Sequence, residues 1–344
     1  MIGRQIILDQ LHGREAAALM VDGKLHDLLV DNDAIRPGAI YRAIAERPVK
    51  GQGGMFLRTP DGSVFLRQVK GLRPGQALLV QVTGHAEQGK AVPVTDRILF
   101  KSRYAIVTPN APGLNISRQI RDDERRDALL AIADDEMGED EFGLILRSSC
   151  MDAPDGEIAE DIRAMCDLAH AIIADTSDEA EALTEGDGPH ALAWRDWVDP
   201  AEVITTEGSF ESLGVLEAVD ALQTPVVRLG SGASMIIEPT RALVAVDVNT
   251  GTDTTPAAAL KANIATARDL PRQLRLRGLG GQITIDVAPM PKKDRRAFEM
   301  ALKSAFRADQ IDTVMAGWTP LGHFELQRQR ARRPLEEILS EVLR

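Results

Sequence analysis

Two aspartates in the C-terminal third of the chain each follow a strongly apolar segment. Asp247 stands near the end of RALVAVDV, and Asp286 stands near the end of QITIDV. Asn249 lies two residues beyond Asp247, and residues two apart on a strand project from the same face. Two carboxylates and an amide oxygen are hard ligands of the kind that Mg²⁺ uses, with other positions left for water and phosphate oxygens. A metal in such a site can polarise a phosphodiester and supply hydroxide.

These side chains meet only if a strand–helix–strand unit carries them. Between the two apolar segments, Leu260, Ile264, Ala267 and Leu274 form the apolar face of an expected helix. Strands joined by such a crossover are parallel, so their carboxyl ends meet at one sheet edge, where α/β proteins bind ligands. The sequence therefore predicts an α/β domain over residues 225–344. The alternative stays open that each aspartate only begins a turn, and that reading is preferred for either segment alone.

The rest of the chain predicts a mixed α/β, multidomain protein. Residues 1–35 are expected to form a β element with a hairpin turn at Asp22-Gly23. Residues 36–100 contain five short alternating segments separated by Gly and Pro, which is typical of a small closed barrel such as an oligonucleotide-binding fold. Residues 101–175 predict a lobe with helices and a buried strand. Residues 176–224 predict an acidic, mobile linker followed by a short helical region.

Composition and charge bound the class of protein. The 344 residues exceed what one core usually organises, and the hydrophobic and charged fractions of 44% and 27% are ordinary for a soluble protein. No signal peptide and no apolar segment of transmembrane length is present, so we expect a cytoplasmic protein without a membrane partner. A formal net charge of −12 argues against indiscriminate binding along nucleic acid. However, residues 268–344 hold 15 Lys and Arg against 10 Asp and Glu. This balance fits a localised phosphate site, although solvated helix faces explain the basic run 292–296 equally well.

Two cysteines, Cys150 and Cys166, are present, without a CxxC pair or a Cys/His cluster. Neither a disulfide framework nor structural zinc is therefore indicated, and we expect both side chains to be buried. A nucleotide-binding βαβ unit is also disfavoured, because no GxGxxG or Walker loop follows a strand.

The C-terminal segments resemble the ribonuclease E/G family. The likeness runs from EPTRALVAVDVNTG through NIATARDLPRQLRLRGLGGQITIDV to GHFELQRQRARRPL, and it extends more weakly over nearly the whole chain. The resemblance implies that Asp247 and Asp286 hold a catalytic Mg²⁺, that Asn249 supports the site, and that a DNase I-like domain hydrolyses single-stranded RNA. It also implies that residues 1–35 are the remnant of an RNase H-like subdomain. The rest of that subdomain is abbreviated and lies within residues 176–224.

The predicted barrel resembles the S1 domain of the same family. The resemblance assigns RNA stacking to Phe65 and substrate contact to Lys90. Stacking contributes roughly 1–3 kcal/mol per base, so one aromatic side chain matters measurably. A core phenylalanine and a solvated lysine remain alternatives, and for Phe65 the two readings have equal weight.

Residues 101–175 resemble the family's sensor for a 5′-monophosphate. The resemblance assigns phosphate binding to Arg147 and Ser148, and places Ser102 and Ile106 in the lining. An arginine beside a hydroxyl suits a terminal phosphate, although a lone arginine after a buried strand is more often structural.

Several departures from the family pattern put turnover in doubt. Pro289 in IDVAPM stands where the family has an acidic residue, the segment after DVNTG is shorter than usual, and Pro271 is expected to interrupt the helix. Proline inside a helix costs roughly 3 kcal/mol. Two hypotheses follow: a magnesium-dependent endoribonuclease that cleaves single-stranded RNA and favours 5′-monophosphate ends, or a non-catalytic RNA-binding regulator or adaptor that keeps the fold.

The resemblance also bears on assembly. Some family members join two subunits through a zinc ion shared between CPxC motifs downstream of the catalytic strands. No cysteine follows Cys166 in this sequence, and His323 alone cannot replace the missing thiolates. We expect a compact member without the zinc link, and a monomer, although exposed apolar surface leaves another interface open.

Overall fold

The computed structural model of the protein describes residues 3–49, 53–68, 71–86, 89–138 and 140–342. The chain divides into two units, the first formed by Met1–Asn32 with Ala201–Arg344 and the second by Asp33–Pro200. Among the described residues, no helix is long and apolar enough to cross a membrane.

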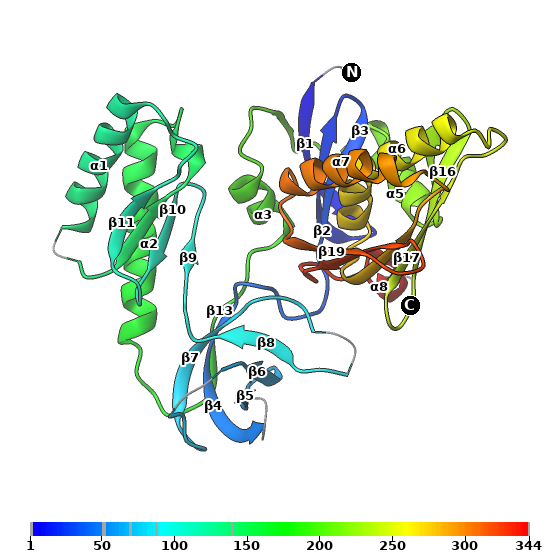
Figure 1. The fold of residues 1–344 in the computed structure, drawn as a ribbon. Helices are drawn as coiled ribbons and strands as arrows, with labels where there is room; N and C mark the ends of the chain where they lie inside the picture. Colours follow the sequence, from blue (N-terminus) through cyan, green and yellow to red (C-terminus); the bar gives the residue numbers. More distant parts are fainter. Residues whose placement is uncertain (1–2, 50–52, 69–70, 87–88, 139, 343–344) are drawn as a thin grey trace. The chain divides into compact units, whose positions relative to one another are not determined.

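The first unit contains a six-stranded sheet of order β15-β16-β17-β18-β20-β19 (Figure 1). Its strands are β15 (Val226–Gly230), β16 (Ala233–Pro239), β17 (Val244–Asn249), β18 (Gly281–Asp286), β19 (Thr313–Trp318) and β20 (Phe324–Arg328). Strands β17 and β18 are parallel and are connected through α6 (Pro256–Leu276), as the sequence predicts. The buried residues of α6 and α7 (Arg295–Arg307) pack on one face of this sheet, with Leu270, Ile283 and Phe298 in the shared core. The opposite face carries the exposed side chains of β17 and β18.

Helix α6 runs continuously through Pro271, so the expected interruption is wrong. Pro271 is buried, and tertiary packing of the helix offsets the backbone hydrogen bond that proline cannot make. Ala267 and Leu274 are buried as predicted, whereas Leu260 and Ile264 are half-buried at the side of the core-facing stripe.

A four-stranded sheet of order β14-β1-β2-β3 completes the first unit. Its strands are β1 (Arg4–Leu11), β2 (Arg14–Val21), β3 (Lys24–Val30) and β14 (Glu202–Ile204). Asp22 and Gly23 adopt φ values of 50° and 76°, which confirms the predicted hairpin turn. Helices α4 (Ser209–Ser212), α5 (Val215–Leu222) and α8 (Leu335–Val342) contribute Phe210, Val219 and Leu339 to the core beneath it.

Buried ion pairs join β3 to α6 and to the segment before α8. The Asp27 carboxylate accepts from both terminal nitrogens of Arg332, and it lies 3.4 Å from Arg275 Nε. Arg275 also binds Asp309, which pairs with the fully buried Arg328 at 2.6 Å. The helix that separates the two candidate site strands is thereby fixed to both sheets.

The second unit contains the barrel. Its strands are β4 (Ile40–Val49), β5 (Gly54–Thr59), β6 (Gly62–Leu66), β7 (Ala77–Val82) and β8 (Val92–Thr95). Pairing of β4 with β7 closes the order β4-β5-β6-β8-β7. The five predicted strands therefore form a closed barrel of the oligonucleotide-binding type, and the mixed α/β, multidomain fold class is confirmed.

The acidic stretch after α2 (Asp155–Ala174) contains a strand instead of only a linker. Strand β13 (Glu181–Thr184) pairs with β4 on the barrel. Arg42 on β4 is buried, and its guanidinium binds Asp175 at 2.9 Å and Glu181 at 2.8 Å. Two acidic residues of the stretch that we expected to be mobile, Asp175 and Glu181, therefore bind one buried arginine.

Most of the remaining elements of the second unit lie within the lobe predicted over residues 101–175, whereas α3 (Pro189–Asp196) lies within the predicted linker region 176–224. The sheet order is β11-β12-β10-β9. The elements are β9 (Phe100–Lys101), β10 (Ala105–Thr108), β11 (Gly113–Ile116), α1 (Asp123–Met137), β12 (Gly143–Leu146), η1 (Ser148–Cys150), α2 and α3 (Pro189–Asp196). Cys150 and Cys166 are free and buried, as expected, and burial raises the pKa of each thiol to about 11.

Candidate active site

Asp247 and Asp286 are direct partners in the register of β17 and β18. Neighbouring strands lie roughly 4.8 Å apart, so the two carboxylates project side by side. Val246 and Ile285, the residues before them, are buried, while both aspartates are exposed. The alternation along each strand thus turns the aspartates to the sheet face that the helices leave open.

Asn249 lies on the same exposed face of β17 and holds the first carboxylate. Its Nδ2 donates a hydrogen bond to Asp247 Oδ2 at 2.8 Å. Gly251 follows with φ 74°, and a Cβ there would collide with the carbonyl oxygen of Gly232. The short turn after Asn249 therefore requires glycine where it passes the β15–β16 connection.

A buried asparagine fixes the segment that follows Asp286. Asn263 on α6 is fully buried, donates from Nδ2 to Ala288 O at 2.9 Å, and accepts from Ala288 N at 2.9 Å. Asn263 was not predicted as a site residue, although a polar residue on an apolar helix face was a usable signal. Pro289, which stands where the resemblance predicts an acidic residue, follows directly after this anchored backbone.

His323 and Glu325 share this surface and were missed as site residues. His323 Nε2 lies 3.9 Å from Asp286 Oδ1. Glu325 pairs with Thr284 in the register of β18 and β20. Glu325 is therefore diagonal to Asp286 across the two strands, and residues in diagonal positions are separated by roughly 7–8 Å. Its carboxylate lies on the same face as the two aspartates but farther from Asp286. Only the pairing of β18 with β20 brings these residues to the aspartates.

The two aspartates fit an open magnesium site better than a closed metal cage. Within the described part of the chain, no group of three or more His, Cys, Asp and Glu side chains could hold a metal ion. Mg²⁺ needs only one or two carboxylates when water and phosphate oxygens complete its coordination. Asp247 and Asp286 are placed so that they could supply those carboxylates, and Asn249 holds one of them in place.

Comparison with known proteins matches the chain to the family described as "Ribonuclease E/G family" over residues 100–205 and 198–331. The chain belongs to the ribonuclease E/G family. It is similar to the protein named ribonuclease E of Synechocystis sp., with 27% identity over 98% of this chain and 58% of that protein. It is also similar to ribonuclease G of Escherichia coli (strain K12), with 28% identity over 78% of this chain and 62% of that protein. The chain thus spans about three-fifths of the length of these curated relatives.

The two residues predicted to bind RNA, Phe65 and Lys90, lie on the outside of the barrel. Phe65 is half-buried between the core residues Val64 and Leu66, so it projects to the opposite side of β6. Its ring lies 5.2 Å from that of Phe56. Lys90 is exposed. An outward aromatic pair weakens the interpretation of Phe65 as a core residue, and the RNA-binding roles stay predictions.

The lobe brings Arg147 and Ser102 together and engages both of them internally. Arg147 donates to Ser102 O at 2.5 Å and to Arg195 O at 3.1 Å, and it pairs with Asp196 at 2.9 Å. The Ser102 hydroxyl donates to Asp161. A phosphate at Arg147 would therefore have to compete with Asp196.

The other two predicted sensor residues flank the same region of the lobe. Ser148 begins η1 directly after Arg147 and is half-buried. Ile106 is half-buried on β10, the strand that pairs with β12. The sensor role of these residues stays a prediction.

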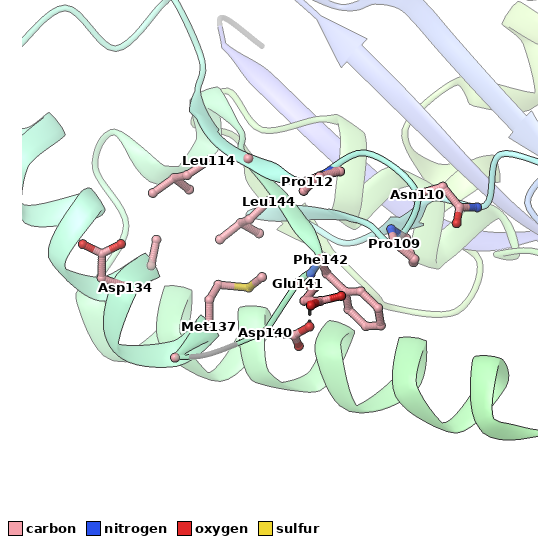
Figure 2. Close-up of a pocket in the computed structure, with 13 residues that line it drawn as sticks. Pro109, Asn110, Pro112, Leu114, Asp134, Met137, Asp140, Glu141, Phe142 and Leu144 are labelled. Carbon is pink, nitrogen blue, oxygen red and sulfur yellow. Dashed lines mark hydrogen bonds between the residues drawn. The ribbon is translucent and has the colours of Figure 1, made fainter.

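The lobe contains a separate hollow of about 630 Å³. Figure 2 shows residues that line it. None of the four predicted sensor residues lines it. Its lining combines apolar and acidic side chains, including Pro109, Leu114, Met137, Phe142, Leu144, Asp134, Asp140 and Glu141. Carboxylates repel a phosphate, so this hollow is unsuited to a 5′-phosphate.

Proposed function

We propose that the protein is an endoribonuclease that cleaves single-stranded RNA at a metal site formed by Asp247 and Asp286, with Mg²⁺ as the metal. The observation that carries the proposal is the register of β17 and β18, which sets the two carboxylates side by side on an exposed sheet face in a member of the ribonuclease E/G family. Relatives named ribonuclease E and ribonuclease G support the same activity.

The side chains divide the work at this site. When bound, Mg²⁺ supplies Lewis-acid polarisation of the phosphodiester and lowers the pKa of a coordinated water. Asp247 and Asp286 would hold the ion with their two negative charges, and Asn249 orients Asp247 through its hydrogen bond. Because both carboxylates face solvent, water and an RNA strand could reach an ion that they hold.

We further propose that Arg147 favours RNA with a 5′-monophosphate. Lys101 and Arg195 lie in the same charged cluster: burial, and then the charge of Arg195, lower the pKa of Lys101. Burial alone would raise the pKa of Asp196, but Arg195 and Arg147 outweigh it, so this pKa is lowered. A doubly charged phosphate can replace Asp196 as the partner of Arg147, because charge-assisted bonds from arginine to phosphate are strong.

Cleavage of labelled, 5′-monophosphorylated single-stranded RNA, with and without Mg²⁺, tests the proposal. We expect magnesium-dependent cleavage by the wild type. Asp247→Asn and Asp286→Asn should abolish it and leave RNA binding largely intact, because each change removes one metal-binding charge and leaves the barrel unchanged. Asp220→Asn, an exposed aspartate on α5, is the matched control and should cleave like the wild type.

Two outcomes would change the assignment. Substantial activity in either Asp247→Asn or Asp286→Asn would show that the metal lies elsewhere. RNA binding by a wild type that never cleaves would favour the regulator or adaptor. The feature that keeps this candidate is Pro289, which stands where the resemblance predicts an acidic residue.

A further inference from the structure

A basic segment lies between β18 and the first turn of α7. Its cations are Lys292 and Lys293 in η2 (Lys292–Asp294), followed by Arg295 and Arg296. The first turn of α7 contains no acidic residue, and Asp294 makes no side-chain capping bond. Cations at a helix N-terminus oppose the helix dipole and reduce local stability. A bound anion would offset this unfavourable interaction between the cations and the helix dipole, so the basic segment is suited to anion binding.

Arg295 is the member of this segment with a defined position. Its guanidinium carbon lies 4.3 Å from the centroid of the Trp318 ring. Among the described residues, no acidic side chain forms an ion pair with Arg295, and its buried Nε lacks a hydrogen-bond partner. Stacking on an aromatic ring leaves the terminal N–H groups of a guanidinium available for a planar, two-point contact with phosphate.

The Trp318 ring is itself held in place. Its Nε1 donates to Glu299 Oε1 at 2.5 Å. The ring packs edge-on against Phe324, with centroids 5.2 Å apart, and lies 5.8 Å from the ring of Phe298. A platform fixed by its neighbours reduces the conformational entropy that Arg295 would lose on binding.

Two distances place Arg295 near the candidate metal site. A Cβ on Gly322 would lie 3.5 Å from Arg295 Nη2. The next residue is His323, whose Nε2 lies 3.9 Å from Asp286 Oδ1. The guanidinium is therefore adjacent to the turn that contacts the aspartate.

We propose that Arg295, held on Trp318, binds a backbone phosphate of the RNA strand next to the phosphate that is cleaved. Arg295 forms charge-assisted hydrogen bonds to that phosphate, and Trp318 is its positioning residue. The inference rests on the proposed function for the position of the cleaved bond, but binding through Arg295 can be measured without cleavage.

The test measures the affinity of the full chain for short single-stranded RNA in chelator, across a range of salt concentrations. We expect Arg295→Ala to raise the Kd about ten-fold at low salt, and to reduce the slope of log affinity against log salt by about 0.7, the value for one lost phosphate contact on a single strand. Arg296→Ala removes the same charge from the next position, which a helix turns away by about 100°, and should change both quantities much less. Arg295→Lys should recover the slope but not the full affinity, because lysine lacks the planar fork.

Trp318→Leu separates positioning from charge. It should weaken binding without altering net charge, and its unfolding temperature is measured alongside so that a folding defect is recognised. An unchanged slope in Arg295→Ala, or equal effects of Arg295→Ala and Arg296→Ala, would overturn the inference. A wild type that binds RNA through Arg295 yet never cleaves would support this inference and overturn the proposed function.

Discussion

Replacing Asp27 with asparagine should lower the stability of the first unit by about 3 kcal/mol. The Asp27 side chain is 3% exposed and accepts hydrogen bonds from Arg332 at 2.5 and 3.1 Å and from Leu28 N at 2.9 Å. Removing one partner of a buried ion pair costs about 3–5 kcal/mol, because the other charge stays buried without compensation. Arg332 is 21% exposed and Arg275 keeps Asp309, so the lower end of that range applies.

The effect should depend on pH in a defined direction. Burial alone would raise the pKa of Asp27, but Arg332 and Arg275 outweigh it and hold the pKa below its ordinary value of 3.8. A carboxylate whose pKa is lowered by folding contributes its full stability above the unfolded pKa and loses it as the pH falls through the folded pKa. The difference between Asp27→Asn and the wild type should therefore be constant above the ordinary value and should shrink only below it.

Thermal and urea unfolding of the full chain measure this prediction, with Asp220→Asn as the exposed control. One kcal/mol shifts the midpoint of a unit of this size by about 2–4 °C, so Asp27→Asn should lower it by roughly 6–12 °C. A shift no larger than that of the control would show that the pairs of Asp27 are dispensable. A larger difference from the wild type at low pH than at neutral pH would refute the sign of the linkage.

Four further predictions concern the sites. Phe65→Ala should raise the Kd for single-stranded RNA about ten-fold, from the roughly 1–3 kcal/mol of one stacked base; unchanged binding in a filter assay would argue for a packing role. Arg147→Ala should reduce the preference for 5′-monophosphate over 5′-hydroxyl RNA by about an order of magnitude, and equal losses on both substrates would mark Arg147 as structural. Cys150 and Cys166, buried and with pKa values of about 11, should resist alkylation at neutral pH until the chain unfolds; rapid labelling detected by mass spectrometry in the native protein would contradict their burial. Because neither thiol lies at the surface, the purified protein should contain no stoichiometric zinc and light scattering should show no zinc-linked dimer, a prediction that a chelator-sensitive zinc dimer would defeat.

The local pattern of the sequence already contained the candidate metal site. Apolar residues alternate or run through β17 and β18, and each strand reaches a carboxylate near its end, so the sequence pattern predicts that Asp247 and Asp286 meet at one sheet edge. Their direct pairing in the register is decided by the structure. The hairpin turn at Asp22-Gly23 and the five strands of the barrel were predicted for the same reason. Turn chemistry and burial periodicity act within a few residues of the chain.

Contacts between distant segments were decided only by the tertiary structure. His323 reaches Asp286 because β20 pairs with β18, and Arg295 meets Trp318 because α7 packs beside β19. Helix α6 continues through Pro271 because core packing outweighs a local propensity of about 3 kcal/mol. The interaction energies that decide these features arise between residues far apart in the chain. A single sequence gives the type of each residue but not the partner that it contacts.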